Sequence, residues 1–124
     1  MPRLELVVGV GLRPGTPADE IVAAVREVLG DAIIRQLATI DRRADEPGFR
    51  TAAEHLGAEV VSVPVVDLQV VQVQNPSARV TAALGTSSVA EAAALSVSGE
   101  KELITPKTIV SGVVIAAAPF RNAE

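Results

Sequence analysis

Glycines and a guanidinium group follow the first strand-like segment of the chain. The apolar segment Leu4–Val8 reads as a buried strand, and the octapeptide GVGLRPGT follows it at residues 9–16. Glycines let backbone N–H groups approach an anion ahead of a helix, and Arg13 adds a donor suited to a carboxylate or phosphate. Pro14 stands where the dinucleotide-binding pattern needs its third glycine, and no Gly-Lys-Ser/Thr follows. The segment therefore predicts either an anion site or a tight turn that needs small residues.

A second concentration of charge follows the next strand-like segment, Ile33–Ile40. Three carboxylates and two guanidinium groups stand within the six residues DRRADE, 41–46. If the two strands are parallel neighbours, both loops lie at the carboxyl edge of the sheet, where open α/β sheets bind ligands. Asp41 and Glu46 could then transfer protons or orient basic residues. The alternative is a solvated loop in which Asp45 caps the next helix, since surface ion pairs are common.

Two further candidates lie toward the C-terminus. Ser88 and Glu91 have the spacing of a capping box at a helix start, whose free N–H groups could also bind an anion. Lys107 follows Pro106 between two strand-like segments, where a lysine is commonly a solvated turn residue. The single histidine, His55, belongs to no catalytic or metal-ligand spacing. We therefore predict no metal site and no cofactor.

Helical and strand-like segments alternate, as they do in α/β layer folds. Three helices are expected: from a Thr16 cap and Pro17 to Gly30, from Asp45–Pro47 to Gly57, and over Ser88–Ser98. The last of these is apolar almost all round and should be deeply packed. Beyond the first two strands, the expected strands are Glu59–Val63, Leu103–Ile104 and Ile109–Ala117, the last two joined through Pro106 and Lys107. The segment Val65–Gln74 is ambiguous between strand and helix, and after the turn residues 75–77 Ser77 could cap a brief helix ending at Gly85.

The composition limits the classes of function. A length of 124 residues suits one domain, and 48% hydrophobic residues suffice for a core without metal or disulfide. The net charge of −4 and the absence of Trp and Tyr disfavour duplex and single-strand nucleic-acid binding. The lack of cysteine excludes thiolate catalysis and thiolate metal sites. Neither a signal-peptide core nor a run of about 18 apolar residues occurs, so we expect a cytoplasmic protein that does not bind membranes.

Taken in order, five segments resemble the CobE family, which is similar to the C-terminal domain of the CbiG proteins of cobalamin (vitamin B12) biosynthesis. These segments are GVGLRPGT, ATIDRRADEPG, NPSARV, GTSSVAEAAAL and LITPK. The resemblance implies one three-layer α/β/α domain over residues 1–124, with a mixed, mostly parallel sheet of about five strands. It also favours a helical or irregular structure for Val65–Gln74. The positions that match the family's pattern are Gly9, Gly11, Arg13, Gly15, Asp41, Glu46, Ser88, Glu91 and Lys107.

Three positions depart from the family's usual pattern. Leu12 stands where a cysteine is common, so any chemistry that needs that thiol is lost. Arg43 stands where a lysine is common; it keeps the charge but cannot serve as a proton-transferring amine. Ile109 replaces a second common lysine. These departures favour anion recognition over lysine catalysis.

The resemblance implies a role in cobalamin biosynthesis, where CbiG is associated with hydrolytic opening of a lactone in cobalt-precorrin-5A. Our first hypothesis is binding of a precorrin, a macrocycle with acetate and propionate side chains. The expected binding residues are Gly9, Gly11, Arg13, Gly15, Arg43, Ser88, Glu91 and Lys107. The second hypothesis is hydrolysis or rearrangement of the macrocycle with Asp41 or Glu46 as base. The third is a purely structural or interaction role, with other enzymes of the pathway as partners.

Overall fold

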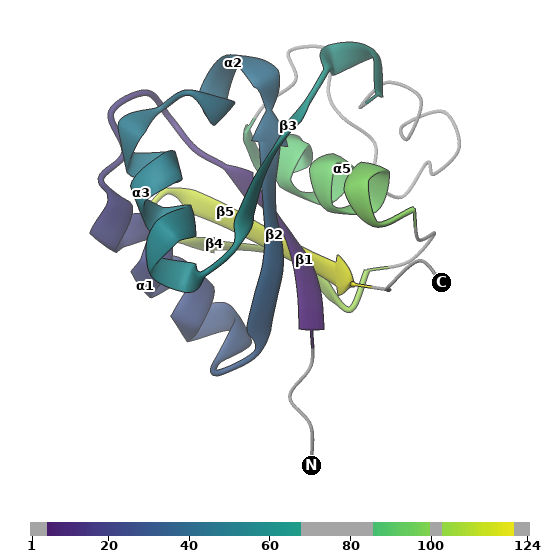
Figure 1. Ribbon diagram of the computed structural model, residues 1–124, viewed down its shortest axis with the longest axis horizontal. Coiled ribbons are helices and arrows are strands. Elements are labelled where there is room, and N and C mark those ends of the chain that lie inside the picture. The colour runs from purple at the N-terminus through teal and green to yellow at the C-terminus, as the bar shows by residue number, and fades with distance from the viewer. Residues whose placement is uncertain (1–4, 68–85, 100–102, 121–124) are drawn as a thin grey trace.

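A five-stranded mixed sheet forms the centre of the computed structural model, which describes residues 5–67, 86–99 and 103–120 (Figure 1). Across the sheet the strands are β3 (Glu59–Val63), β2 (Ile33–Ile40), β1 (Glu5–Gly11), β5 (Val113–Pro119) and β4 (Thr105–Val110). The strands β1, β2 and β3 are parallel, and β5 is antiparallel to both β1 and β4. All strands except β5 therefore run in one direction, which confirms the mixed, mostly parallel sheet.

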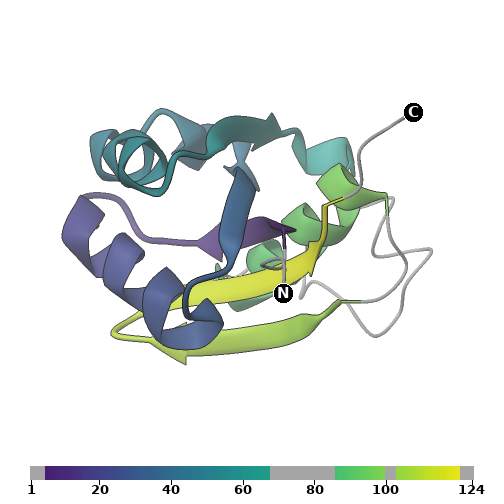
Figure 2. The same cartoon turned by 60° about the horizontal axis from the view of Figure 1, so that its bottom comes forward.

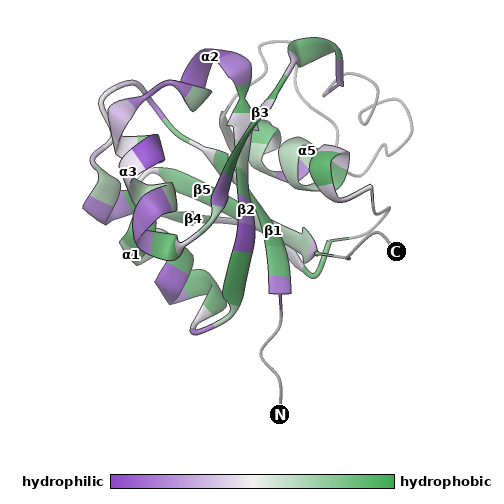
Figure 3. Cartoon of the chain, in the orientation of Figure 1, coloured by the Kyte–Doolittle hydropathy of each residue, from purple (hydrophilic) through white to green (hydrophobic). Residues whose placement is uncertain are grey.

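Helices cover both faces of this sheet, so the domain has three layers (Figure 2). On one face lie α1 (Ala18–Leu29) and α3 (Pro47–Leu56), and on the other lies α5 (Thr86–Ser98). The core beneath α1 and α3 includes Ile21 and Phe49, whereas Val89 and Leu95 of α5 join a second cluster with Ile40. The central strands β1 and β5 are accordingly mostly apolar, whereas apolar and polar residues alternate along α1 and α3 (Figure 3). This arrangement confirms the expected α/β/α layers.

The helix α5 lies against β1 more closely than a side chain would allow. A Cβ atom at Gly9 would lie 1.9 Å from the carbonyl oxygen of Ala90 and 2.8 Å from the amide nitrogen of Ala94. Gly9 is buried and pairs with Ala38 of β2 and Ala116 of β5. The expectation that the first strand ends at Val8 is therefore wrong, because β1 continues to Gly11. Gly9 lies inside this strand, where the absence of a side chain lets the α5 backbone approach.

The helix starts differ from their expected positions. Pro17 is the N-cap of α1, and the Thr16 hydroxyl donates instead to the carbonyl oxygen of Arg13 at 2.7 Å. Residues 41–44 form a short helix, α2 (Asp41–Ala44), in place of a loop. Glu46, not Asp45, is the N-cap residue of α3. The capping box is also wrong, because Ser88 lies inside α5, which begins at Thr86. The expected glycine stops of α1 and α3, Gly30 and Gly57, are confirmed.

The last two strands form a hairpin whose turn lies later than expected. Pro106 and Lys107 lie within β4, and the turn is at Ser111 and Gly112, which have φ angles of 52° and 81°. Two consecutive positive φ angles match the two-residue type I′ turn, whose twist fits the flanking strands. Proline is tolerated in β4 because this strand is at the edge of the sheet. The predicted join through Pro106 and Lys107 is therefore wrong.

The ambiguous segment that begins at Val65 starts as a helix over residues 65–67. Its remainder, the turn at residues 75–77 and the brief helix expected to end at Gly85 lie outside the described residues. Within the described ranges, no helix is long and apolar enough to cross a membrane.

Candidate functional site

A small hollow lies at the carboxyl ends of β1 and β2, beside α2 and the first turns of α5. It is lined by Gly11, Leu12, Thr39, Ile40, Arg42, Arg43 and Val89. The last paired residues of β1 and β2 are Gly9 and Ala38, whereas β1 continues along β5 to Gly11. The hollow therefore lies where β1 and β2 separate, next to the point at which the strand order changes direction. This is the part of an open α/β sheet where ligands bind.

The walls of the hollow are largely apolar. Leu12, Ile40 and Val89 are each at most 3% exposed. The hydroxyl of Thr39, also buried, donates to the carbonyl oxygen of Val10 at 2.7 Å and so joins the two strands where they part. Because that hydroxyl already has a partner, the lining side chains with hydrogen-bonding groups left free by the described residues are those of Arg42 and Arg43.

Three guanidinium groups belong to the same edge. Arg43 is half-buried and Arg42 exposed at the hollow, and Arg13 is exposed two residues beyond Gly11. Within the part of the chain that the structure describes, none of the three pairs with a carboxylate, whereas Arg50 contacts Asp45 at 2.8 Å. Sequence reasoning selected Arg13 and Arg43 but not Arg42, although the DRRADE segment contains it. These three guanidinium groups therefore have no direct ion pair among the described residues, although three carboxylates stand in the same segment as Arg42 and Arg43.

The two expected proton-transfer residues occupy different surroundings. Asp41 is exposed at the start of α2. The Glu46 carboxylate instead accepts a hydrogen bond from the backbone N–H of Gly15, with 2.9 Å between Oε1 and the nitrogen. Glu46, predicted as a proton-transfer residue, and Gly15, predicted to bind the ligand, thus contact each other across 31 positions of sequence.

Glu91 and Lys107 lie on a different side of α5 from the hollow. The Glu91 carboxylate accepts a hydrogen bond from the backbone N–H of Lys107 in β4, at 3.0 Å. Val89, by contrast, packs toward β2 and lines the hollow. The structure therefore places Arg43 and the start of α5, which contains Ser88, at the hollow and Arg13 in the turn after β1, but places Lys107 in the edge strand β4. No group of three or more metal-ligating side chains occurs among the residues described.

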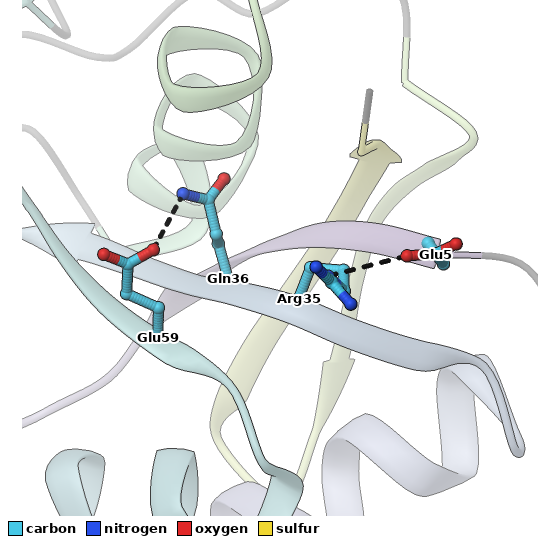
Figure 4. Close-up of polar contacts among 4 residues, drawn as sticks. All are labelled: Glu5, Arg35, Gln36 and Glu59. Carbon is cyan, nitrogen blue, oxygen red and sulfur yellow. Dashed lines mark hydrogen bonds and ion pairs between the residues drawn. The ribbon is translucent and has the colours of Figure 1, made fainter. Parts of the chain in front are cut away.

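The opposite, amino edge of the parallel strands also contains charged residues, but they have partners. Arg35 contacts Glu5 at 3.5 Å, and Gln36 donates to Glu59 at 3.3 Å (Figure 4). Arg26, beside a larger cavity at this edge, donates to the carbonyl oxygens of Gly30 and Ala32. The contrast favours the carboxyl edge as the place where an external anion would bind.

Comparison with known proteins adds family relationships to this geometry. A family described as "Cobalamin synthesis G C-terminus" matches residues 6–118. Protein CobE of Sinorhizobium sp is 34% identical over 119 residues, covering 90% of this chain and 77% of that protein. A cobalt-precorrin-5A hydrolase of Priestia megaterium is 30% identical over 118 residues, covering 91% of this chain but only 32% of the hydrolase.

Solved structures share the fold. A crystal structure of CobE, a protein from the cobalamin biosynthetic pathway, has a TM-score of 0.76 at 28% identity, covering 100% of this chain and 95% of that one. The cobalamin biosynthesis protein chiG from Agrobacterium tumefaciens has a TM-score of 0.72 at 30% identity, covering 94% and 99%. A cobalamin biosynthesis protein G homologue from Sulfolobus solfataricus, at 21% identity and a TM-score of 0.70, shares the fold over 97% of this chain and 38% of its own.

Proposed function

The chain belongs to the cobalamin synthesis G C-terminus family, and we propose that it binds a precorrin intermediate through the carboxylate side chains of the macrocycle. The observation that carries the proposal is the pair of guanidinium groups at the hollow, Arg42 and Arg43, with Arg13 in the turn after the neighbouring strand β1; none has an ion-pair partner among the described residues. We call these three residues the arginine edge.

The hollow beside the arginine edge matches the chemistry of one precorrin side chain. An acetate or propionate group has a short hydrocarbon stem and a terminal carboxylate. The stem fits the apolar walls formed by Leu12, Ile40 and Val89, while Arg43 can hold the carboxylate in a bidentate hydrogen bond. The substitution of lysine by arginine at position 43 suits this role, because the planar guanidinium matches the carboxylate geometry.

The hollow is too small to accept a macrocycle. The ring would therefore lie outside the hollow, over the exposed edge of the sheet. One acetate or propionate side chain would enter the hollow, and other side chains of the ring would reach Arg13 and Arg42. An exposed ion pair contributes at most about 1 kcal/mol, so affinity would arise from several carboxylates held together. The protein would thus hold or deliver an intermediate by contacting several carboxylates of one ring at the same time.

Hydrolysis has less support from the geometry. A general base must reach the proton that it abstracts. One oxygen of the Glu46 carboxylate accepts the Gly15 N–H, and neither Glu46 nor the exposed Asp41 is among the residues that line the hollow. The chain also spans about a third of the cobalt-precorrin-5A hydrolase that it matches. A product of altered mass after incubation with a precorrin would favour hydrolysis over binding alone.

The binding proposal is tested by titrating the protein with cobyrinic acid, a stable corrin with free acetate and propionate groups, and with its methyl ester. We expect saturable binding of the acid and much weaker binding of the ester. Arg13→Ala and Arg43→Ala should each weaken binding of the acid roughly fivefold. Arg50→Ala is the matched control, because Arg50 already pairs with Asp45. Equal affinities for acid and ester, or an effect of Arg50→Ala equal to that of Arg43→Ala, would overturn the proposal.

A further inference from the structure

We propose that Glu46 is a positioning residue, which latches the turn containing Arg13 to the segment containing Arg43. The consequence of this latch for ligand affinity rests on the binding function proposed above. The latch itself is a property of the free protein and can be measured without ligand. Its components are one side-chain hydrogen bond, one backbone hydrogen bond and one close approach of two backbones.

The first component fixes the turn after β1. The backbone N–H of Gly15 donates to Glu46 Oε1 at 2.9 Å. Within the turn, the backbone N–H and the hydroxyl of Thr16 both donate to the carbonyl oxygen of Arg13, at 3.2 Å and 2.7 Å. Arg13 therefore belongs to a turn that is closed on itself and held from outside by the Glu46 carboxylate.

The second component connects Glu46 to the other guanidinium groups. The backbone N–H of Glu46 donates to the carbonyl oxygen of Arg43 at 3.1 Å. A single residue thus bonds to the Arg43 segment through its main chain and to the Arg13 turn through its side chain. Removing the side chain would leave the bond to Arg43 in place and free the Arg13 turn.

The third component is the contact between the two segments at Gly48. A Cβ atom at this position, in the first turn of α3, would lie 2.0 Å from the carbonyl oxygen of Thr16. Backbone therefore meets backbone directly beside the Glu46–Gly15 hydrogen bond. This approach places the Glu46 carboxylate within reach of the turn, and it brings two segments that are separate in sequence into direct contact.

The latch requires a side-chain oxygen at position 46 that can reach the backbone N–H of Gly15, and this oxygen need not be negatively charged. A glutamine side-chain oxygen can accept the same hydrogen bond from Gly15, whereas the shorter aspartate side chain cannot reach the same position. A proton-transfer role makes the opposite demand, because it needs the carboxylate. The variants Glu46→Gln and Glu46→Asp therefore separate positioning from base chemistry.

The test measures hydrogen exchange of the Gly15 amide by NMR in the free protein, together with the affinity for cobyrinic acid. We expect Glu46→Gln to retain wild-type exchange and affinity. Glu46→Ala and Glu46→Asp should exchange the Gly15 amide about fivefold faster, consistent with the loss of one hydrogen bond, and bind the corrin about threefold more weakly. Glu54→Ala, which removes an exposed carboxylate from the same helix, is the matched control and should leave both quantities unchanged.

Two results would overturn the inference: unchanged Gly15 exchange in both Glu46→Ala and Glu46→Asp, or loss of affinity in Glu46→Gln equal to that in Glu46→Ala. If Glu46→Ala fails to fold, the comparison of Glu46→Gln with Glu46→Asp decides the same question. If the wild-type protein binds no corrin, the binding proposal fails, and the exchange rates alone then support or overturn the latch.

Discussion

Replacing Gly9 with alanine tests the contact between α5 and the sheet. The added Cβ atom would lie 1.9 Å from the carbonyl oxygen of Ala90, and an ordinary contact needs about 3.4 Å, so α5 must retreat by about 1.5 Å at this point. A retreat of this size would open the contacts of Val89 and Leu95, which belong to α5 and are buried in the cluster with Ile40. Overpacking of a core costs about 1 to 3 kcal/mol. Because the clash is with backbone atoms, which no rotamer change can relieve, we expect the upper end, about 3 kcal/mol.

The free energy of unfolding of Gly9→Ala is measured by urea denaturation, with Gly57→Ala as the control. A Cβ atom at Gly57 meets no atom within 4 Å, and its left-handed backbone, with a φ of +69°, makes alanine strained by about 1 kcal/mol. Gly9→Ala should therefore lose clearly more stability than Gly57→Ala, and its melting temperature should fall by roughly 10 °C. Equal losses in the two variants would refute the reasoning. So would unchanged stability combined with weakened corrin binding, the result that an anion-binding role for Gly9 predicts.

Two other predictions concern buried and edge hydrogen bonds. Thr39→Val removes the hydroxyl that joins β2 to β1 at the hollow, and should lower the free energy of unfolding by about 1 kcal/mol in urea denaturation; no loss would contradict the role of this bond. Glu91→Ala frees the backbone N–H of Lys107 on the edge strand β4, and should increase concentration-dependent association measured by light scattering. Glu91→Gln keeps an acceptor and should behave as the wild type, so equal association of the two Glu91 variants would count against edge protection.

The first two βα units could be predicted because their signals are local. The strands at Ile33–Ile40 and Glu59–Val63 occur at the expected positions. The stops at Gly30 and Gly57 are confirmed because a positive φ at a helix end depends on one residue, and glycine adopts it without strain. The deep packing of the helix at Thr86–Ser98 also followed from its composition, since four of its alanines are buried.

Other features depend on contacts between distant parts of the chain. Gly9 resembles a ligand-loop glycine in sequence, and only the position of α5 shows that it admits a helix backbone. The proline at position 106 indicates a turn, but an edge strand tolerates it, and the turn forms at Ser111 and Gly112. Helix capping by Glu91 was inferred from spacing alone, whereas its carboxylate contacts a strand 16 positions away.

The candidate site was predicted in part. The placement of Arg13 and Arg43 at one edge follows from the parallel pairing of β1 and β2, which the alternation of elements indicated. Arg42 was missed because the family pattern drew attention to its neighbour, although both stand in the same charged segment. Lys107 was grouped with the arginines because it was expected in a connection between two strands. In the structure it lies inside the edge strand β4, beyond α5.

The central claim is that a corrin carboxylate binds at the arginine edge, and NMR mapping of the backbone amides tests it most directly. Addition of cobyrinic acid should shift the amide signals of residues 11–16 and 40–46 most strongly, with those at the start of α5. Signals at the amino edge, over residues 31–35, should remain unchanged because the charged groups there already have partners. Shifts confined to the amino edge, or no shifts at a saturating concentration of cobyrinic acid, would contradict the account.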